Sequence, residues 1–226
     1  MGPKLTKDAV LLVESTLPKD PITLFSSWLE HANQKLPKYQ MASAMCLSTS
    51  DKENVSGRMV MVRKFDQTGF LFFTNGNSKK SGDLEKLPNA ALTSYWSTEG
   101  STRSVRIEGT VRKIPEEGLL KAWSMVPRAN KIQITLSEFS SSVASGGREE
   151  LEKKQRELEE KYPESSAETA TTIPKPDYWV GYKLIPRRIE FWHERQASFP
   201  DRFEYKLSDE KSTDDTVNWV INRLNP

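Results

Sequence analysis

Apolar side chains recur at helical spacing early in the chain. Asp20 and Pro21 predict a helix start, because aspartate is a favourable N-cap and proline suits the first helical position. After them, Phe25, Trp28 and Leu29 fall on one face at the spacing of an α-helix. The pattern predicts an amphipathic helix whose apolar stripe packs into a core.

From residue 41 to residue 114 the pattern changes to short runs rich in β-branched and aromatic residues. In SVRIEGTV, Val105 and Ile107 share one face while Arg106 and Glu108 point the other way. Turn-forming residues separate the predicted strands, which are MASAMCLSTS, GRMVMVRKF, GFLFFTN, AALTSYWS and RSVRIEGTVRKI. One short helix, over about residues 78–87, interrupts them. Strands that follow each other without long helices favour an antiparallel sheet or barrel.

The second half of the chain begins with helices and returns to strands. Helices are predicted from Pro115 to about Met125, after Pro127, and over the charged run GGREELEKKQRELEEKY, which reads as a solvated surface helix. A polar loop then leads to strands in YWVGYKLIP, RRIEFWHE and RFEYKL, and to a short docking segment, VNWVINRLNP. The late strands need partners, and the early sheet can supply them. We therefore predict one α+β domain over residues 20–226, preceded by a loose arm over residues 1–19.

Composition narrows the classes of function. The chain has 226 residues, of which 36% are hydrophobic and 28% charged, and its net charge of +2 argues against a dedicated nucleic-acid binder. No run approaches the roughly 18 apolar residues of a membrane span, and no secretory signal is visible. Two histidines and one cysteine, without HExxH or CxxC spacing, argue against a metal site. Cys46, the single cysteine, is expected to be a buried, inert thiol, and we expect a cytoplasmic protein.

A group of basic residues flanks a predicted hairpin and the start of the short helix. Arg58 begins an apolar strand, Thr74 ends the next strand, and Ser78, Lys79 and Lys80 open the helix. A helix N-terminus suits an anion, and basic side chains add charge-assisted hydrogen bonds to phosphate oxygens. These residues alone leave two interpretations open, a solvated surface or a phosphate site.

The order of motifs along the chain favours the phosphate site. The chain contains R-M-x-x-x-[RK], G-F-x-F-F-T-N, S-[RK]-K, an aromatic strand ending in Y-W, R-x-V-R-[IV]-E-G, PKPDYWVGYKLIP, IEFW and DRFEY. Together these motifs resemble the pyridoxamine 5′-phosphate oxidase family over about residues 20–226. The resemblance implies a split β-barrel, antiparallel and Greek-key-like with flanking helices. It also implies a homodimer that binds FMN at the subunit interface with residues of both chains.

The resemblance assigns four sets of residues to the flavin. They are strand residues along the ring, a basic pair associated with the phosphate, a serine (Ser140) that reaches in from the partner chain, and a tryptophan and an arginine (Trp192 and Arg202) near the ring. Two family glutamines near the ring are replaced by Ser104 and Phe139, a change that bears on flavin affinity or redox potential. For Trp192 the alternative is simple core packing. The implied cofactor residues are Arg58, Met59, Val60, Met61, Phe73, Thr74, Lys79, Lys80, Ser104, Ser140, Trp192 and Arg202.

The family's substrate residues carry over poorly. The lysine that grips the substrate phosphate is Arg63 here, so a positive charge survives. A tyrosine, an arginine and a serine near that phosphate align with Ala122, Val126 and Asn130. The family's R-L-H motif, which faces the substrate ring, aligns with the segment Ser198–Pro200. The implied substrate pocket is therefore less positive and more hydrophobic.

Three nearby basic residues offer partial compensation: His193, Arg195 and, after a loop shift of two residues, Arg128. Three hypotheses stay open. The first is an FMN-dependent oxidoreductase acting on a B6 phosphate or another small molecule; it needs neither catalytic triad nor metal, because the flavin performs the redox step. The second is a non-catalytic flavin- or B6-phosphate-binding protein, and the missing R-L-H supports it. The third is a partner-binding scaffold that has lost FMN. The retained flavin residues argue against this third hypothesis. No nucleic-acid or membrane partner is expected.

Overall fold

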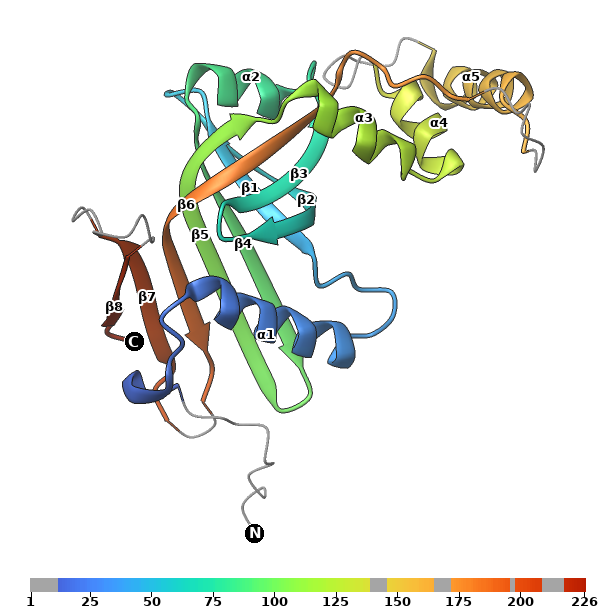
Figure 1. Cartoon of the computed structure of the whole chain (residues 1–226). Coiled ribbons are helices and arrows are strands. Elements are labelled where there is room, and N and C mark those ends of the chain that lie inside the picture. Colours follow the sequence, from blue (N-terminus) through green and yellow to red (C-terminus); the bar gives the residue numbers. More distant parts are fainter. Residues whose placement is uncertain (1–11, 139–145, 165–171, 196–197, 209–217) are drawn as a thin grey trace.

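An antiparallel sheet dominates the computed structural model, which describes residues 12–138, 146–164, 172–195, 198–208 and 218–226. The strand order is β3-β2-β1-β4-β5-β6-β7-β8, and β3 also pairs with β6. The second pairing closes β1 to β6 into a barrel, while β7 and β8 extend the sheet beyond β6 (Figure 1). The predicted α+β class with an antiparallel barrel is confirmed. The strands are β1 (Ala44–Ser50), β2 (Val55–Asp66), β3 (Gly69–Asn75), β4 (Asn89–Thr98), β5 (Ser101–Lys113), β6 (Trp179–His193), β7 (Asp201–Leu207) and β8 (Trp219–Arg223).

The strands follow the predicted runs, with two corrections at the C-terminal end. The predicted break between YWVGYKLIP and RRIEFWHE is wrong, because β6 continues through Pro186. An irregularity in the β5–β6 register between Glu108 and Gly109 lets the proline stay within the strand. A Cβ atom at Gly109 would lie 2.0 Å from the carbonyl oxygen of Ile185, so only glycine allows this close approach. The predicted docking segment at the end of the chain is β8, which pairs with β7.

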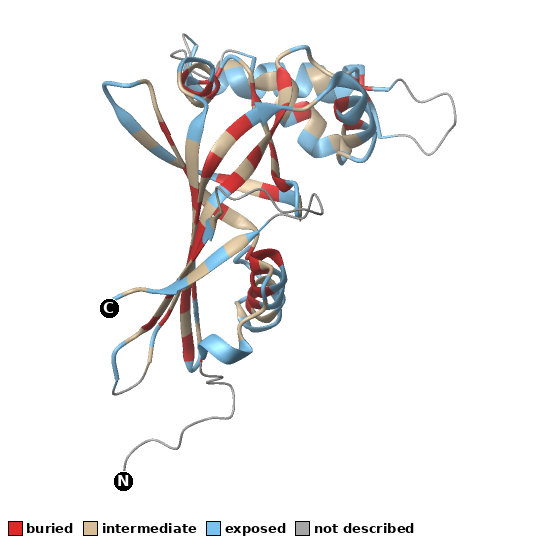
Figure 2. Ribbon diagram, turned by 60° about the vertical axis from the view of Figure 1, so that its left-hand side comes forward, coloured by how far each residue is buried: buried red, intermediate tan, exposed pale blue. Residues whose placement is uncertain are grey.

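Buried residues alternate with more exposed ones along the strands (Figure 2). The buried apolar side chains fill the barrel. Val105 and Ile107 are buried as predicted. Cys46 is partly exposed, so the expectation of a buried thiol is wrong. Its neighbours Met45 and Leu47 point into the barrel, and the period of two therefore turns Cys46 outward.

Helix α1 (Pro21–Lys35) covers one end of the barrel, opposite the other helices (Figure 1). Asp20 caps it as predicted, since its carboxylate accepts a hydrogen bond from the Ile22 amide at 3.0 Å. Phe25 and Trp28 of the predicted apolar stripe are buried and Leu29 is partly buried. Phe25 makes an edge contact with Phe70 at 5.0 Å between ring centroids. Among the described residues, no helix is long and apolar enough to cross a membrane.

The segment before α1 is held against the end of the sheet, so the expected loose arm is not found over residues 12–19. A short 3₁₀ turn, η1 (Glu14–Thr16), lies beside β8, where the Arg223 guanidinium binds the Glu14 carboxylate at 2.5 Å. Arg223 also donates to the carbonyl of Leu12, which is buried, at 3.0 Å. Tyr205 donates to the Pro18 carbonyl at 2.8 Å. Residues 1–11 of the predicted arm lie outside the described residues.

A second, smaller core forms where three helices pack beside the barrel. These helices are α3 (Glu116–Ser124), α4 (Arg128–Leu136) and α5 (Gly147–Lys161). Trp123 packs on Trp179 of β6 and donates to the Ile173 carbonyl at 3.0 Å. Helix α5 has no buried residue and is the predicted surface helix. The short helix α2 (Lys79–Lys86) begins just after β3, close to its predicted start.

Candidate functional site

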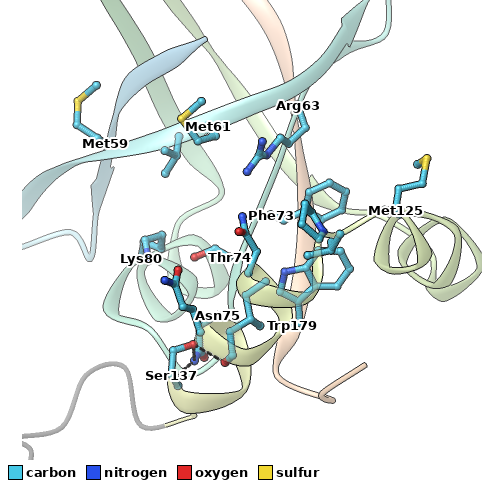
Figure 3. A pocket seen from close by; sticks show the side chains of 17 residues that line it. Met59, Met61, Arg63, Phe73, Thr74, Asn75, Lys80, Met125, Ser137 and Trp179 are labelled. Atoms are coloured by element: carbon cyan, nitrogen blue, oxygen red, sulfur yellow. Dashed lines mark hydrogen bonds between the residues drawn. The ribbon is translucent and has the colours of Figure 1, made fainter. Parts of the chain in front are cut away.

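A cavity of about 600 Å³ opens between the outer side of β2, the end of β3, the start of α2, and helices α3 and α4 (Figure 3). The two sheet strands and α2 supply Met59, Val60, Met61, Arg63, Phe73, Thr74, Asn75 and Lys80, and β6 adds Trp179. The helical side supplies Ala122, Met125, Val126, Pro127, Asn130, Gln133, Ile134 and Ser137. Many of the residues that the resemblance assigned to the flavin and the substrate thus meet in one place.

Strand alternation sets the β2 wall of this cavity. Val62 points into the barrel and is buried, so the side chains of Met59, Met61 and Arg63 project from the opposite face. Figure 3 shows Lys80 on the side of Met59 and Met61, and Arg63 on the side of Met125. The cavity therefore has two ends with different surroundings.

The helical wall is fastened to the sheet at the C-terminal end of α4. The Asn75 side-chain amide donates to the Ser137 carbonyl, and the Tyr178 hydroxyl donates to the Thr135 carbonyl at 2.8 Å. The Asn77 amide donates to the Glu138 carbonyl at 3.1 Å. The last carbonyl groups of a helix have no intrahelical partner, so these bonds satisfy them. They hold α4 at a set position beside the end of β3.

Aromatic and aliphatic side chains line the end of the cavity near Arg63. Phe73 and Trp179 stack at 4.6 Å between centroids with an interplanar angle of 15°. Ala122 of α3 and Val126 of the turn after α3 also line this end of the cavity. The side chains at these two positions leave this end of the cavity apolar.

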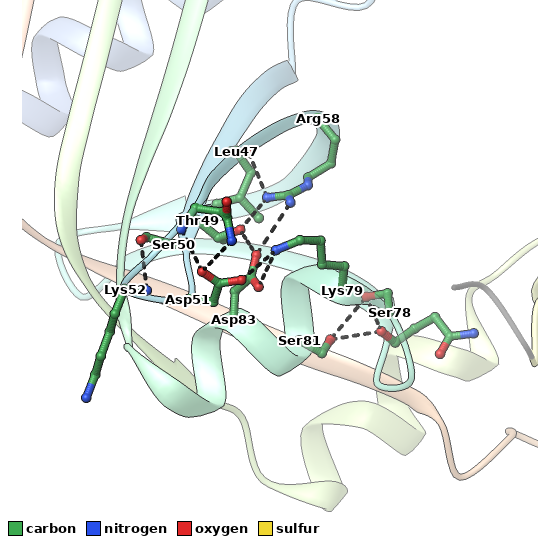
Figure 4. A network of polar contacts seen from close by, with 12 residues as sticks. Leu47, Thr49, Ser50, Asp51, Lys52, Arg58, Ser78, Lys79, Ser81 and Asp83 are labelled. Atoms are coloured by element: carbon green, nitrogen blue, oxygen red, sulfur yellow. Dashed lines mark hydrogen bonds and ion pairs between the residues drawn. The ribbon is translucent and has the colours of Figure 1, made fainter. Parts of the chain in front are cut away.

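Two of the basic residues are neutralised by nearby carboxylates (Figure 4). The Lys79 ammonium lies 2.8 Å from a carboxylate oxygen of Asp83 and 3.4 Å from one of Asp51. Its hydrogen bond to Asp83 raises the pKa of Lys79. Arg58 donates to the Thr49 hydroxyl at 2.7 Å and lies 3.8 Å from Asp83. Neither Arg58 nor Lys79 lines the cavity.

Lys80 and Arg63, by contrast, line the cavity without an ion-pair partner among the described residues. Lys80 is half-buried, and this burial lowers its pKa, as does the positive charge of Arg58. Arg63 is exposed at the other end of the cavity. The predicted lysine pair is therefore split, with Lys80 facing the cavity and Lys79 facing the two aspartates.

A second group of predicted residues lies on the same outer face of the sheet but away from the cavity. Ser104, Trp192 and Arg202 stand in one row across β5, β6 and β7, each opposite the next in the register. Trp192 is half-buried there and is not part of the barrel core, which argues against simple core packing. In the sheet order β1, β4 and β5 lie between β2 and β6, and β3, which also joins β2 to β6, pairs only with residues 179–184 of β6. None of these three residues lines the cavity of the same chain.

Some of the predicted substrate residues line the cavity and others lie outside it. Arg63 and Asn130 line the cavity, whereas Ser198 is exposed in the connection from β6 to β7. Arg195 pairs with Asp201 at 3.3 Å, away from the cavity. Ser140, like Phe139, lies outside the described residues.

Arg128 does not supply the compensating charge considered for it. Its guanidinium donates to the Tyr162 carbonyl at 2.7 Å and to the Glu159 carbonyl at 3.1 Å, at the C-terminal end of α5. Arg128 therefore joins two helices, and its aligned neighbour Val126 leaves this part of the wall apolar.

Sequence reasoning missed several residues of the cavity. Gln133 follows Asn130 by three positions on α4, so helical spacing alone was a signal that both share a face. Asn75 directly follows the predicted Thr74 at the end of β3. Trp179 and Met125 carried no local signal, because each reaches the cavity through the packing of α3 against β6.

His193 is buried at the far end of β6 and takes no part in the cavity. Its ring makes an edge contact with Trp28, and its Nε2 lies 3.3 Å from the Ser101 hydroxyl. Burial lowers its pKa to about 4, as do the positive charges of Arg103 and Arg195, while Asp201 opposes the shift. The imidazole is therefore neutral in the folded protein over most of the acidic range.

Acidification is expected to destabilise the fold through His193. The unfolded chain binds a proton at the ordinary histidine pKa of 6.5, whereas the folded chain does so only near pH 4. Stability is therefore full above pH 6.5 and falls as the pH drops toward about 4. Thermal unfolding of the wild type and of His193→Gln across this range measures the effect. The variant should lose most of the slope between these two pH values, and an unchanged slope would assign it to other groups.

Comparison with known proteins places the chain in a family. Residues 32–175 match the family described as pyridoxamine 5′-phosphate oxidase, and residues 179–226 match the pyridoxine 5′-phosphate oxidase C-terminal dimerisation region. A pyridoxine/pyridoxamine 5′-phosphate oxidase of Bombyx mori is 36% identical over 228 residues, covering 97% of this chain and 85% of the relative. A pyridoxine-5′-phosphate oxidase of Bos taurus is 39% identical over 188 residues, covering 83% of this chain and 68% of the relative.

Solved structures agree on the fold. PhzG from Burkholderia lata superposes with a TM-score of 0.81 at 23% identity, covering 97% of this chain and 98% of that one. A pyridoxamine 5′-phosphate oxidase-related, FMN-binding protein from Nostoc punctiforme superposes with a TM-score of 0.66 at 17% identity, covering 93% and 100%. The matched regions span the barrel, the cavity and the C-terminal strands. This chain therefore belongs to the pyridoxamine 5′-phosphate oxidase family.

Proposed function

We propose that the protein is an FMN-dependent oxidoreductase of the pyridoxine/pyridoxamine 5′-phosphate oxidase type with a divergent substrate pocket. One observation carries the proposal: Lys80 is a half-buried cation that faces a cavity, has no carboxylate partner in the described chain, and stands at a helix start. A desolvated cation at such a place is stabilised by a bound anion. The family relatives named above support the same reading.

The residues around the cavity fit FMN. Lys80 and the first N–H groups of α2 would hold the phosphate, because the Ser78 side chain bonds the Asn75 carbonyl and does not cap the helix. The outer face of β2 at Met61 and the Thr74 hydroxyl would lie along the rest of the molecule. When bound, FMN supplies hydride acceptance and reoxidation by oxygen. The chain's own part is to bind and orient the two molecules and to exclude water from the apolar end.

A homodimer completes the site in this proposal. Trp192 and Arg202 belong to the region matched to the family's dimerisation region, yet neither lines the cavity of the same chain. Met59, which lines the cavity, and Tyr95, which pairs with Ser104 of the row, lie on the same outer face and are exposed by 63% and 68%. A second copy packed on this face would cover them and bring its own row to the cavity of the first.

The reaction proposed is the oxidation of a carbon that bears an amine or a hydroxyl, by transfer of a hydride to the flavin. A B6 phosphate is one candidate substrate, because the curated relatives are named for it. Arg63 would bind the anionic group of the substrate, with the Asn130 amide as a second donor. In a competing candidate, a non-catalytic flavin- or B6-phosphate-binding protein, the same cavity binds without turnover. The segment Ser198–Pro200 in place of R-L-H favours that alternative.

The purified protein is expected to be a yellow dimer with one FMN per chain. The absorbance spectrum and the FMN-to-protein ratio measure the cofactor, and light scattering measures the mass of the assembly. Trp192→Ala should lower FMN affinity by removing a partner-chain contact, while Trp219→Ala on β8 serves as a control from the same region. A colourless monomer that fails to bind added FMN would contradict the proposal.

A further inference from the structure

The end of the cavity around Arg63 has an unusual balance of charge and apolar surface. Arg63 is the cation there, and no described carboxylate pairs with it. The stacked rings of Phe73 and Trp179 line it, and Val126 adds an aliphatic side chain from the turn between α3 and α4. The polar groups on the helical side are the neutral amides of Asn130 and Gln133.

This balance disfavours a phosphate ester. A phosphate carries a charge of about −1.5 to −2 near neutral pH and three acceptor oxygens. Removing such a group from water is costly unless several charged donors replace its hydration. One guanidinium offers a bidentate match to a planar, singly charged group such as a carboxylate. Lys80 lies at the other end of the cavity, where the proposed FMN phosphate would occupy it (Figure 3).

We propose, on the basis of the function proposed above, that the substrate is a flat aromatic molecule with one singly charged anionic group. The ring packs along Phe73 and Trp179, and the anion binds Arg63. Asn130 and Gln133 donate to its remaining oxygen or to a ring substituent. The phosphate ester of a similar ring binds more weakly at this site.

The test compares three probes that share one ring: 1-naphthylacetate, 1-naphthyl phosphate and 2-(1-naphthyl)ethanol. They are titrated at about pH 8, where the phosphate is a dianion, into the FMN-loaded dimer. Binding is measured by calorimetry and by the shift of the flavin absorbance bands. The wild type should bind the carboxylate roughly tenfold or more tightly than the alcohol, as one charged contact predicts. It should also bind the carboxylate more tightly than the phosphate, because one guanidinium does not offset the larger cost of removing a dianion from water.

Two variants and a control separate charge from shape. Arg63→Gln should weaken the carboxylate by roughly tenfold or more and leave the alcohol unchanged. Lys64→Gln is the matched control, since Lys64 is the adjacent cation, pairs with Asp66 at 3.7 Å and does not line the cavity. Val126→Arg adds a second cation to the wall and should turn the preference toward the phosphate.

Equal or tighter binding of the phosphate by the wild type would overturn the inference, as would an Arg63→Gln variant that keeps the carboxylate preference. Failure of the proposed function is seen separately, as a protein that does not load FMN at all. In that case the same titrations on Lys80→Ala apoprotein decide the anion preference at Arg63, without competition from the second cation. A preference for the carboxylate then supports the inference, and its absence overturns it.

Discussion

FMN-loaded protein is expected to oxidise pyridoxine and pyridoxamine 5′-phosphates with a kcat/KM roughly two to four powers of ten below that of an ordinary family member. The cavity wall has Ala122 and Val126 where the family has polar and charged groups, and Ser198 lies exposed outside it. Two lost charge-assisted contacts at about 1.5–3 kcal/mol each amount to roughly 3–6 kcal/mol. Arg63 recovers part of this loss, because it keeps one cation in the pocket.

Anaerobic mixing of the loaded protein with each B6 phosphate, followed by exposure to air, measures this prediction. Flavin bleaching reports reduction, and product formation in air reports turnover. The Bombyx mori relative, at 36% identity, serves as the comparison enzyme. Bleaching and turnover as fast as in that relative would refute the prediction. Slow bleaching with tight B6-phosphate binding would favour the non-catalytic candidate instead.

Replacement of Lys79 and Lys80 together by alanine is expected to weaken FMN binding by roughly a hundredfold, because one charge-assisted contact of about 1.5–3 kcal/mol is lost together with the smaller effect of a second cation. The structure divides this loss unequally. Lys80→Ala should account for most of it, because Lys80 faces the cavity. Lys79→Ala should change FMN affinity by only a few-fold and lower the melting temperature, since it leaves the buried Asp83 with fewer partners.

Equilibrium titration of each apoprotein with FMN and with riboflavin tests this division. Riboflavin lacks the phosphate, so its affinity should be nearly the same in the wild type and all variants. An unchanged FMN affinity in the double variant would return both lysines to the interpretation of solvated surface charge. Equal losses in the two single variants would show that Lys79 leaves its aspartates to bind the ligand.

The local elements of the fold were open to prediction from the sequence. The end of β3 and the start of α2 follow from alternation and turn residues, which depend on neighbours within a few positions. The residues from Arg58 to Lys80 lie on β2, β3 and α2, which follow one another in the chain. The order of motifs was therefore enough to predict a binding site there. Continuity of β6 through Pro186 was missed, because it depends on the pairing of β6 with β5, whose register shifts between Glu108 and Gly109.

Only the tertiary structure decided which of the adjacent lysines faces the cavity. Both are cations at the start of one helix, and Asp83 lies four residues after Lys79 in the sequence, but Asp51 comes from the turn after β1. Only the tertiary structure also showed that Trp192 and Arg202 lie outside the cavity, because their position relative to β2 depends on the order of strands in the sheet. Residue types along the chain determined the chemistry available to this protein. Contacts between distant segments determined which charges are neutralised by the fold and which are left for a ligand.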